Sequence, residues 1–285
     1  FLSLTGWIQK LADHTPKPVV RGIQVALGGM LGWQGLKWII GWQKLTVMSS
    51  DWIVNVFLGV IAIVIVLTFR ENKYAPASIV LIVLGIAFAG IKGELLKVLK
   101  VGFELPSITT FSLRDIYQAM IQAGFAQLPL TATNAIIATS ALIKEYWPQR
   151  KVSEKKLTLN MGILNVIVVF FGGMPMCHGA GGLAGQYYFG ARTGGANIIE
   201  GLIEISLGLF FSQAIVGLFR AFPTSIIGAM MLMVGVNLAK YALELRNKDI
   251  VVAGVTTIVS IIWNIAFGFV AGFLVYYFIK AASKN

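Results

Sequence analysis

The sequence predicts an all-α polytopic membrane protein. Of its 285 residues, 57% are hydrophobic and only 12% are charged, and the mean hydropathy is +0.79. A soluble globular domain carries about twice that share of charged residues. Several apolar segments reach about the length that crosses the hydrocarbon core of a bilayer. The chain is therefore expected to cross a membrane several times. Its single cysteine excludes a disulfide within the chain.

The first part of the chain contains three predicted spans. A partly polar lead-in, residues 1–17, precedes Val19–Gly41, Trp52–Phe69 and Ala75–Ile91. Trp52–Phe69 is the clearest of the three because its apolar run is about as long as a crossing requires. The following segment, Lys92–Asp115, is polar enough to lie at the membrane surface.

The middle of the chain contains two interrupted segments. Tyr117–Ile143 is a predicted span broken by Pro129, and a strongly basic loop follows it. Leu157–Phe171 is a regular span. It leads into Gly172–Gly195, which combines many glycines with Pro175 and with the only cysteine of the chain. Such a stretch is unlike a plain membrane-spanning helix, so we interpret it as a broken span.

The last part contains Asn197–Phe222, Thr224–Ala242 and Ile250–Ile279, the last being long enough for two short crossings. With this division, most of the 23 Lys and Arg residues fall on the side of the membrane that holds the C-terminus. The positive-inside rule then places the C-terminus in the cytoplasm, and we expect a multi-pass protein of the plasma (cytoplasmic) membrane.

The glycine-rich stretch predicts a helix that begins inside the bilayer. Pro175 lacks a backbone donor, and the glycines of Gly179–Gly182 allow unusual backbone angles, so regular helix is expected only after about Gly181. Irregular backbone at membrane depth is tolerated where it is buried in protein or lines a wet cavity. A helix N-terminus gathers free N–H groups and a positive dipole end, which together favour an anion.

The segment around Pro129 adds a second set of polar groups. Gln127, Thr131 and Asn134 form a polar stripe at helical spacing. One interpretation is that they hold packed helices together. The other is that they face a cavity shared with the glycine-rich stretch, which the presence of two broken segments favours.

The donors predicted for the site are neutral, and neither segment contains Asp or Glu. A tetrahedral dianion is best held by neutral donors with a positive dipole behind them, whereas a carboxylate would repel it. The predicted substrate-binding residues are Gln127, Thr131, Asn134, His178, Gly179, Ala180, Gly181, Gly182 and Gln186.

Two titratable residues are candidates for proton coupling. His178 could donate to an oxyanion or take up a proton, because its ordinary pKa lies near neutrality, or it could only fix the bend by bonding to a carbonyl. Glu204, one turn beyond Glu200, could relay protons or pair with a neighbouring span.

Two runs carry a resemblance to a known family. FAQLPLTATN, starting at Phe125, and MPMCHGAGGLAGQY, starting at Met174 and continuing as FGARTG from Phe189, resemble the signatures of the molybdate transporters, relatives of the sulfate permeases. The resemblance implies an inverted-repeat fold of seven plus seven spans, as in sulfate and uracil permeases, with a core domain and a gate domain. It also implies that the substrate is held between half-helices of the core.

The resemblance further implies a division of the chain. Residues 1–115 match gate-domain spans five to seven and a connecting segment, residues 116–222 the second-repeat part of the core domain with its broken helices, and residues 223–285 gate-domain spans twelve to fourteen. The family's Pro-rich signature ending in Gln-Pro-Met-Lys does not occur in this sequence. We therefore expect a chain that lacks roughly four N-terminal spans of the family fold.

The sequence thus predicts a secondary transporter of molybdate or a similar oxyanion and not an enzyme. A sulfate or other anion permease of the same fold stays open, as does a non-transporting structural or channel-like role. A membrane hydrolase is disfavoured because the sequence has no Gly-x-Ser-x-Gly motif. The expected partners are the oxyanion and the lipid bilayer, with proton coupling and a homodimer left open. No cofactor, nucleic acid or protein-bound metal is predicted, and molybdenum enters only as an oxyanion.

Overall fold

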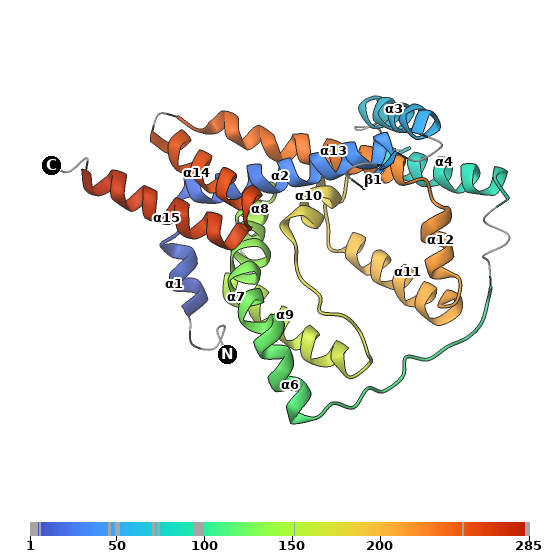
Figure 1. The fold of residues 1–285 in the computed structure, drawn as a ribbon, viewed down its shortest axis with the longest axis horizontal. Helices are drawn as coiled ribbons and strands as arrows, with labels where there is room; N and C mark the ends of the chain where they lie inside the picture. Colours follow the sequence, from blue (N-terminus) through green and yellow to red (C-terminus); the bar gives the residue numbers. More distant parts are fainter. Residues whose placement is uncertain are drawn as a thin grey trace. The chain divides into compact units, whose positions relative to one another are not determined.

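The structure is a computed structural model that describes residues 5, 7–44, 47–48, 52–69, 72, 75–93, 100–150, 152–246 and 248–282. Within these residues the chain is almost entirely helical, and the only strands form a two-stranded antiparallel pair. Figure 1 shows the elements in chain order. Arg70, Lys73, Lys97, Lys151 and Lys284, on which the predicted orientation partly depends, lie outside the described residues.

The elements follow the predicted segments closely in the first part of the chain. They are α1 (Trp7–Asp13), α2 (Lys17–Ile40), β1 (Trp42–Lys44), β2 (Val47–Met48), α3 (Trp52–Phe69) and α4 (Ala77–Ile91). The clearest predicted span coincides with α3, whose apolar side chains are mostly exposed, as expected for a helix that faces lipid. Residues 100–112 contain no helix and run as an extended segment.

The predicted break at Pro129 takes an unusual form. The segment consists of α6 (Leu113–Ala119), the π-helical turn η1 (Met120–Gly124), α7 (Phe125–Leu130), the π-helix η2 (Thr131–Ala138) and α8 (Thr139–Tyr146). Pro129 lies inside α7. Proline cannot donate to the preceding turn, and wider π-turns often occur where a helix accommodates such a fault.

The second half of the chain contains α9 (Glu154–Val169), α10 (Ala180–Tyr188), α11 (Gly195–Phe211), α12 (Ile215–Ala221), α13 (Thr224–Ala239), the 3-10 turn η3 (Lys240–Glu244), α14 (Lys248–Ile262) and α15 (Ile265–Ala282). The predicted crossing Asn197–Phe222 is not one straight helix, because α11 and α12 are bent by 114° at a short break. Three described helices are long and apolar enough to cross a membrane, and up to five crossings result if each bent pair is one span.

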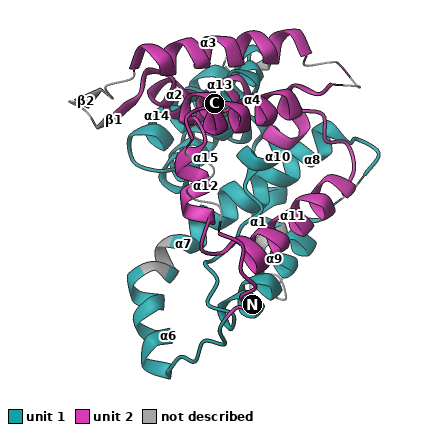
Figure 2. Ribbon diagram, turned by 90° about the vertical axis from the view of Figure 1, so that its right-hand side faces the viewer, with its two compact units in different colours: residues 1–30, 107–184, 235–285 teal, residues 31–106, 185–234 magenta. Residues whose placement is uncertain are grey.

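The described chain divides into two compact units, which Figure 2 colours separately. Unit 1 comprises Phe1–Met30, Ser107–Ala184 and Gly235–Asn285, and unit 2 comprises Leu31–Pro106 and Gly185–Val234. In unit 1, α14 and α15 pack so closely that a Cβ at Gly268 would overlap Ser260, and a Cβ at Gly272 would overlap Thr256. In unit 2, α2 and α13 cross backbone to backbone, since a Cβ at Gly35 would overlap the Gly228 carbonyl oxygen.

Candidate functional site

The candidate site is built around the start of α10 in unit 1. Residues 173–179 have no regular secondary structure, and α10 begins at Ala180, next to the start that the sequence predicts at about Gly181. The first helical bond runs from the Leu183 N–H to the Gly179 carbonyl oxygen (3.2 Å). The N–H groups of Ala180, Gly181 and Gly182 therefore have no acceptor within the helix. A Cβ at Gly182 would meet no atom within 4 Å, so there is open space beside this turn.

Two neutral side chains fix the irregular segment ahead of α10. The Asn165 amide on α9 donates from Nδ2 to the Met176 carbonyl oxygen (2.8 Å), and its Oδ1 accepts from the Met176 N–H (2.7 Å). Thr139, at the start of α8, donates from Oγ1 to the His178 carbonyl oxygen (2.6 Å). Irregular backbone in a membrane protein needs such partners, because unsatisfied peptide groups are costly there.

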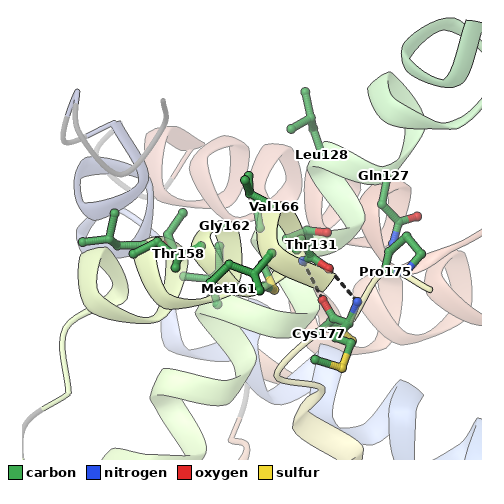
Figure 3. Close-up of a pocket in the computed structure, with 16 residues that line it drawn as sticks. Gln127, Leu128, Thr131, Thr158, Met161, Gly162, Val166, Pro175 and Cys177 are labelled. Carbon is green, nitrogen blue, oxygen red and sulfur yellow. Dashed lines mark hydrogen bonds between the residues drawn. The ribbon is translucent and has the colours of Figure 1, made fainter. Parts of the chain in front are cut away.

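A cavity of about 610 Å³ lies between α7, η2, α9 and the irregular segment (Figure 3). Most of its lining is apolar, and none of its lining residues is Asp, Glu, Lys, Arg or His. It is lined by Gln127, Leu128, Thr131, Ala132, Ile136, Thr158, Leu159, Met161, Gly162, Ile163, Asn165, Val166, Ile167, Pro175, Met176 and Cys177. The amide and hydroxyl groups among them are the polar contacts that the cavity offers to a ligand.

The π-helix η2 presents one buried polar atom without a partner. The Thr133 hydroxyl donates to the Pro129 carbonyl oxygen one turn earlier (2.8 Å), a bond within its own helix. Asn134 is half-buried, and its Oδ1 is buried without a hydrogen-bond partner among the described residues. A buried amide oxygen in that state is costly and suits a donor such as a bound water, whereas an oxyanion could accept a hydrogen bond only from Nδ2 of the same amide.

The predicted substrate-binding residues fall into three groups. Gln127 and Thr131 line the cavity. Asn134 and His178 are linked through Thr139, whose hydroxyl donates to the backbone oxygens of both (3.2 and 2.6 Å). They lie outside the cavity lining, as do the residues that start α10.

Gln186 and the two acids of α11 belong to unit 2. The Gln186 amide donates from Nε2 to the Glu200 carboxylate (2.6 Å). Glu204, predicted as a proton relay, lies exposed on α11.

Sequence reasoning missed Asn165 and Thr139. Asn165 is the only polar side chain in the apolar run that follows Asn160 in this predicted span, which is the signal that could have identified it. Thr139 had no such signal. It contacts a residue 39 positions later in the chain, and a hydroxyl in a helix commonly bonds to its own backbone.

Charged groups of unit 1 are paired away from the cavity. Glu154 at the start of α9 is 2% exposed and accepts from the Ser140 hydroxyl and from the Lys144 Nζ, both at 2.8 Å. Arg21 on α2 pairs with Glu145 on α8 (2.6 Å) and lies over the Tyr241 ring. None of these residues lines the cavity.

The fold resembles a solved structure, that of SLC26A9. The structure of SLC26A9 covers 94% of this chain and 47% of its own chain, with a TM-score of 0.64 and 15% sequence identity. At this identity the likeness shows the fold alone.

Sequence comparisons identify the family. A family profile described as "Molybdate transporter of MFS superfamily" matches residues 119–238, which include the cavity, the irregular segment and α10. Molybdate transporter 1 of Arabidopsis thaliana is 30% identical over 96% of this chain and 68% of that protein, and molybdate transporter 2 of the same plant is 27% identical over 98% and 68%. Molybdate transporter 1 of Chlamydomonas reinhardtii is 35% identical over 69% of this chain and 40% of that protein. The chain thus spans about two thirds of the length of the Arabidopsis proteins, and it belongs to the molybdate transporter family.

Proposed function

We propose that this chain carries molybdate, or a tetrahedral oxyanion of the same charge, across a membrane as a secondary transporter. The observation that carries the proposal is the start of α10, where three N–H groups without intrahelical acceptors follow an irregular segment fixed only by neutral side chains. A dianion loses its hydration on entering an apolar protein, and aligned neutral donors can offset that cost without adding a charge that would hold the ion permanently.

The proposed ligands are those of the sequence analysis. Gln127 and Thr131 offer side-chain donors in the cavity, and Asn134, His178 and Gly179–Gly182 are the proposed donors at the helix start. Gln186, whose amide donates to the Glu200 carboxylate, stays a prediction. The absence of Asp, Glu, Lys, Arg and His from the cavity lining supports an anion that is always charged at neutral pH. His178 and Glu204 are the proposed groups for proton coupling.

The remaining parts of the proposal concern the whole transporter. The family resemblance implies two inverted repeats and a core that moves against a gate, and the basic residues favour a C-terminus in the cytoplasm. A homodimer stays open. The division into residues 1–115, 116–222 and 223–285 stays a prediction. Sulfate is the second candidate substrate, because a tetrahedral dianion of the same charge would use the same donors.

Calorimetric titration of the purified chain with molybdate, and separately with sulfate, tests the proposal. We expect saturable molybdate binding that weakens about tenfold in Asn134→Ala, the loss of one good hydrogen bond to a charged ligand. This variant is a clean probe because the Asn134 Oδ1 has no partner within the described protein, so the substitution orphans nothing at that atom. Asn160→Ala, at an exposed position of α9, is the matched control. Equal affinity in all three proteins would refute the assignment of Asn134. Binding heat with sulfate but not with molybdate would show that sulfate is the substrate.

A further inference from the structure

In the segment that precedes α10, the N–H group and the carbonyl oxygen of Met176 are both hydrogen-bonded to one side-chain amide, that of Asn165. The two hydrogen bonds between Asn165 and Met176 run in opposite directions (2.8 and 2.7 Å), as between two paired residues of a β-ladder (Figure 3, dashed lines). The side-chain amide of Asn165 therefore makes the pair of hydrogen bonds that a peptide group of a neighbouring strand would make. Only three residues separate Met176 from Ala180, where α10 begins. Because the chain is so short here, the position of Met176 limits where the first N–H groups of α10 can lie.

We propose that Asn165 is a positioning residue for the anion site, acting through the Met176 peptide and not by touching the ion. The inference rests on the proposed function of the α10 start. An asparagine suits this role for two reasons. It offers a donor and an acceptor on one planar group, which leucine or alanine cannot, and it does so without charge. An aspartate of similar shape would accept from the Met176 N–H but, when ionised, would face the Met176 carbonyl oxygen without a proton between them.

The substitution Asn165→Asp turns this requirement into a pH-dependent readout. A protonated carboxylic acid has both a donor and an acceptor, so it can restore both bonds to Met176. An ionised one loses one bond and adds repulsion, which also raises the pKa of the new carboxyl group. The defect of the variant should therefore be present at high pH and be relieved as the pH falls. A side chain that only fills space in α9 would give a defect that does not depend on pH.

Other titratable groups near the position are shared by all variants. Cys177 is the one titratable residue in the cavity lining, and His178 lies two positions beyond Met176. Among the described residues, Lys10 and Asp13 belong to α1, which packs against α9, and η2 carries no acid or base. Comparing each variant with the wild type at the same pH removes their common contribution.

The first experiment is titration of the full chain with molybdate at micromolar concentration between about pH 8 and pH 5.5, a range that brackets a raised carboxyl pKa. At the upper end we expect Asn165→Asp to bind about tenfold or more weakly than the wild type, since the Met176 carbonyl oxygen loses its donor and faces a carboxylate instead. The ratio of the two affinities should approach one at the lower end. Asn165→Ala should stay weak throughout, and Asn160→Asp, the same substitution at an exposed position of α9, should match the wild type. A constant ratio for Asn165→Asp across the range would overturn the proposal.

A second readout does not require molybdate. Cys177 follows Met176, is exposed, and is the only cysteine of the chain, so a methanethiosulfonate reagent modifies one site. In Asn165→Asp its modification rate should exceed the wild-type rate several-fold at the upper pH and converge with it at the lower pH. Wild-type protein that gives no heat with molybdate would refute the proposed substrate, while these rates would still decide whether Asn165 fixes the segment. Equal rates in both proteins at every pH would refute the positioning role.

Discussion

Two breaks in the helices of this protein are fastened by different chemistry. The irregular segment before α10, in unit 1, is held by the amide of Asn165 and the hydroxyl of Thr139, both neutral. The bend between α11 and α12, in unit 2, is held by Glu104, whose carboxylate accepts from the Ser212 hydroxyl and from the Gln213 amide. There the extended segment also pairs its backbone, since the Gly102 and Glu104 N–H groups donate to the Phe210 and Leu209 carbonyl oxygens (3.0 and 2.9 Å).

The difference bears on the anion site proposed at the break before α10. A carboxylate is an effective acceptor and fastens the α11–α12 bend with several bonds, but the same group beside a dianion would repel it. The break before α10 is fastened without any charge, and the cavity beside it has none among its lining residues. If this distinction is functional, adding a carboxylate at each of the two breaks should have unequal effects on anion affinity.

The largest expected effect follows from adding a carboxylate at each break. Gln127→Glu places one in the cavity, where a unit charge roughly 6 Å from a dianion interacts by about 5–6 kcal/mol at an effective dielectric of about 20, so molybdate should bind roughly ten-thousandfold more weakly. Gln213→Glu places one beside Glu104 and should leave molybdate affinity within about twofold, although it removes a hydrogen bond. Calorimetric titration of both variants decides the matter. Equal losses of affinity would show that the two breaks do not differ in this respect.

Removing one hydroxyl from each break gives a smaller effect. Thr139→Val keeps the side-chain shape but leaves the His178 carbonyl oxygen without its donor, which should cost about 1–3 kcal/mol of unfolding free energy and weaken anion binding. Ser212→Ala removes a bond to an exposed carboxylate, so it should destabilise less and leave anion binding intact. Thermal unfolding in detergent, with and without molybdate, measures both. A larger loss in Ser212→Ala would contradict the ranking.

The effect of molybdate on the rate of thiol modification should differ between the two breaks by a few-fold. Cys177 lines the cavity and is exposed, so molybdate bound nearby should slow its modification by a methanethiosulfonate reagent. A cysteine at the other break, in the double variant Cys177→Ser with Ser212→Cys, should react at a rate that molybdate does not change. Protection at both positions would indicate a general change of the protein instead of local occupancy.

The smallest effect is the response of the α11–α12 bend to acid. Hydrogen bonds from Ser212 and Gln213 hold the pKa of Glu104 below the usual glutamate range. Such a carboxylate stabilises its contacts above the unfolded-state pKa, and the contribution is lost as the pH falls through the lower folded-state pKa. Hydrogen-exchange protection of the Gly102 and Glu104 amides should therefore decline in acid below the usual glutamate range. In Glu104→Gln, protection should be weaker at neutral pH and should lack that decline, and an unchanged profile would count against the role of the carboxylate.

The sequence was sufficient for features that local chemistry determines. The apolar run of α3 and the start of α10 were predicted within about a residue, because an uninterrupted hydrophobic segment and a Pro-to-Gly transition each act through neighbours in the chain. Gln127, Thr131 and Asn134 were predicted to face a cavity; Gln127 and Thr131 line one, and Asn134 lies outside its lining. A polar side chain within an apolar membrane helix predicts a polar or water-filled environment, so these positions could be identified from their residue type alone.

Features that depend on distant contacts were not predictable. Asn197–Phe222 has the composition of one span, yet α11 and α12 are bent by 114°, and the extended segment that pairs with the bend begins about a hundred residues earlier. The roles of Asn165 and Thr139 likewise require knowing that the irregular segment lies against α8 and α9. The π-helical form of η2 was also absent from the sequence analysis, because a proline predicts a fault in a helix but not how the following turns absorb it.

The backbone crossing of α2 and α13 in unit 2 has a consequence for sequence variation. A Cβ at Gly35 would overlap the Gly228 carbonyl oxygen, and a Cβ at Gly228 would overlap Gly35 in return. The obstructing atoms are main-chain atoms, which cannot change rotamer to make room. In a saturating substitution library these two positions should accept glycine alone, and they should not rescue each other, since enlarging either one leaves the same carbonyl in the way. Gly182, which has open space around it, should tolerate alanine as far as folding is concerned.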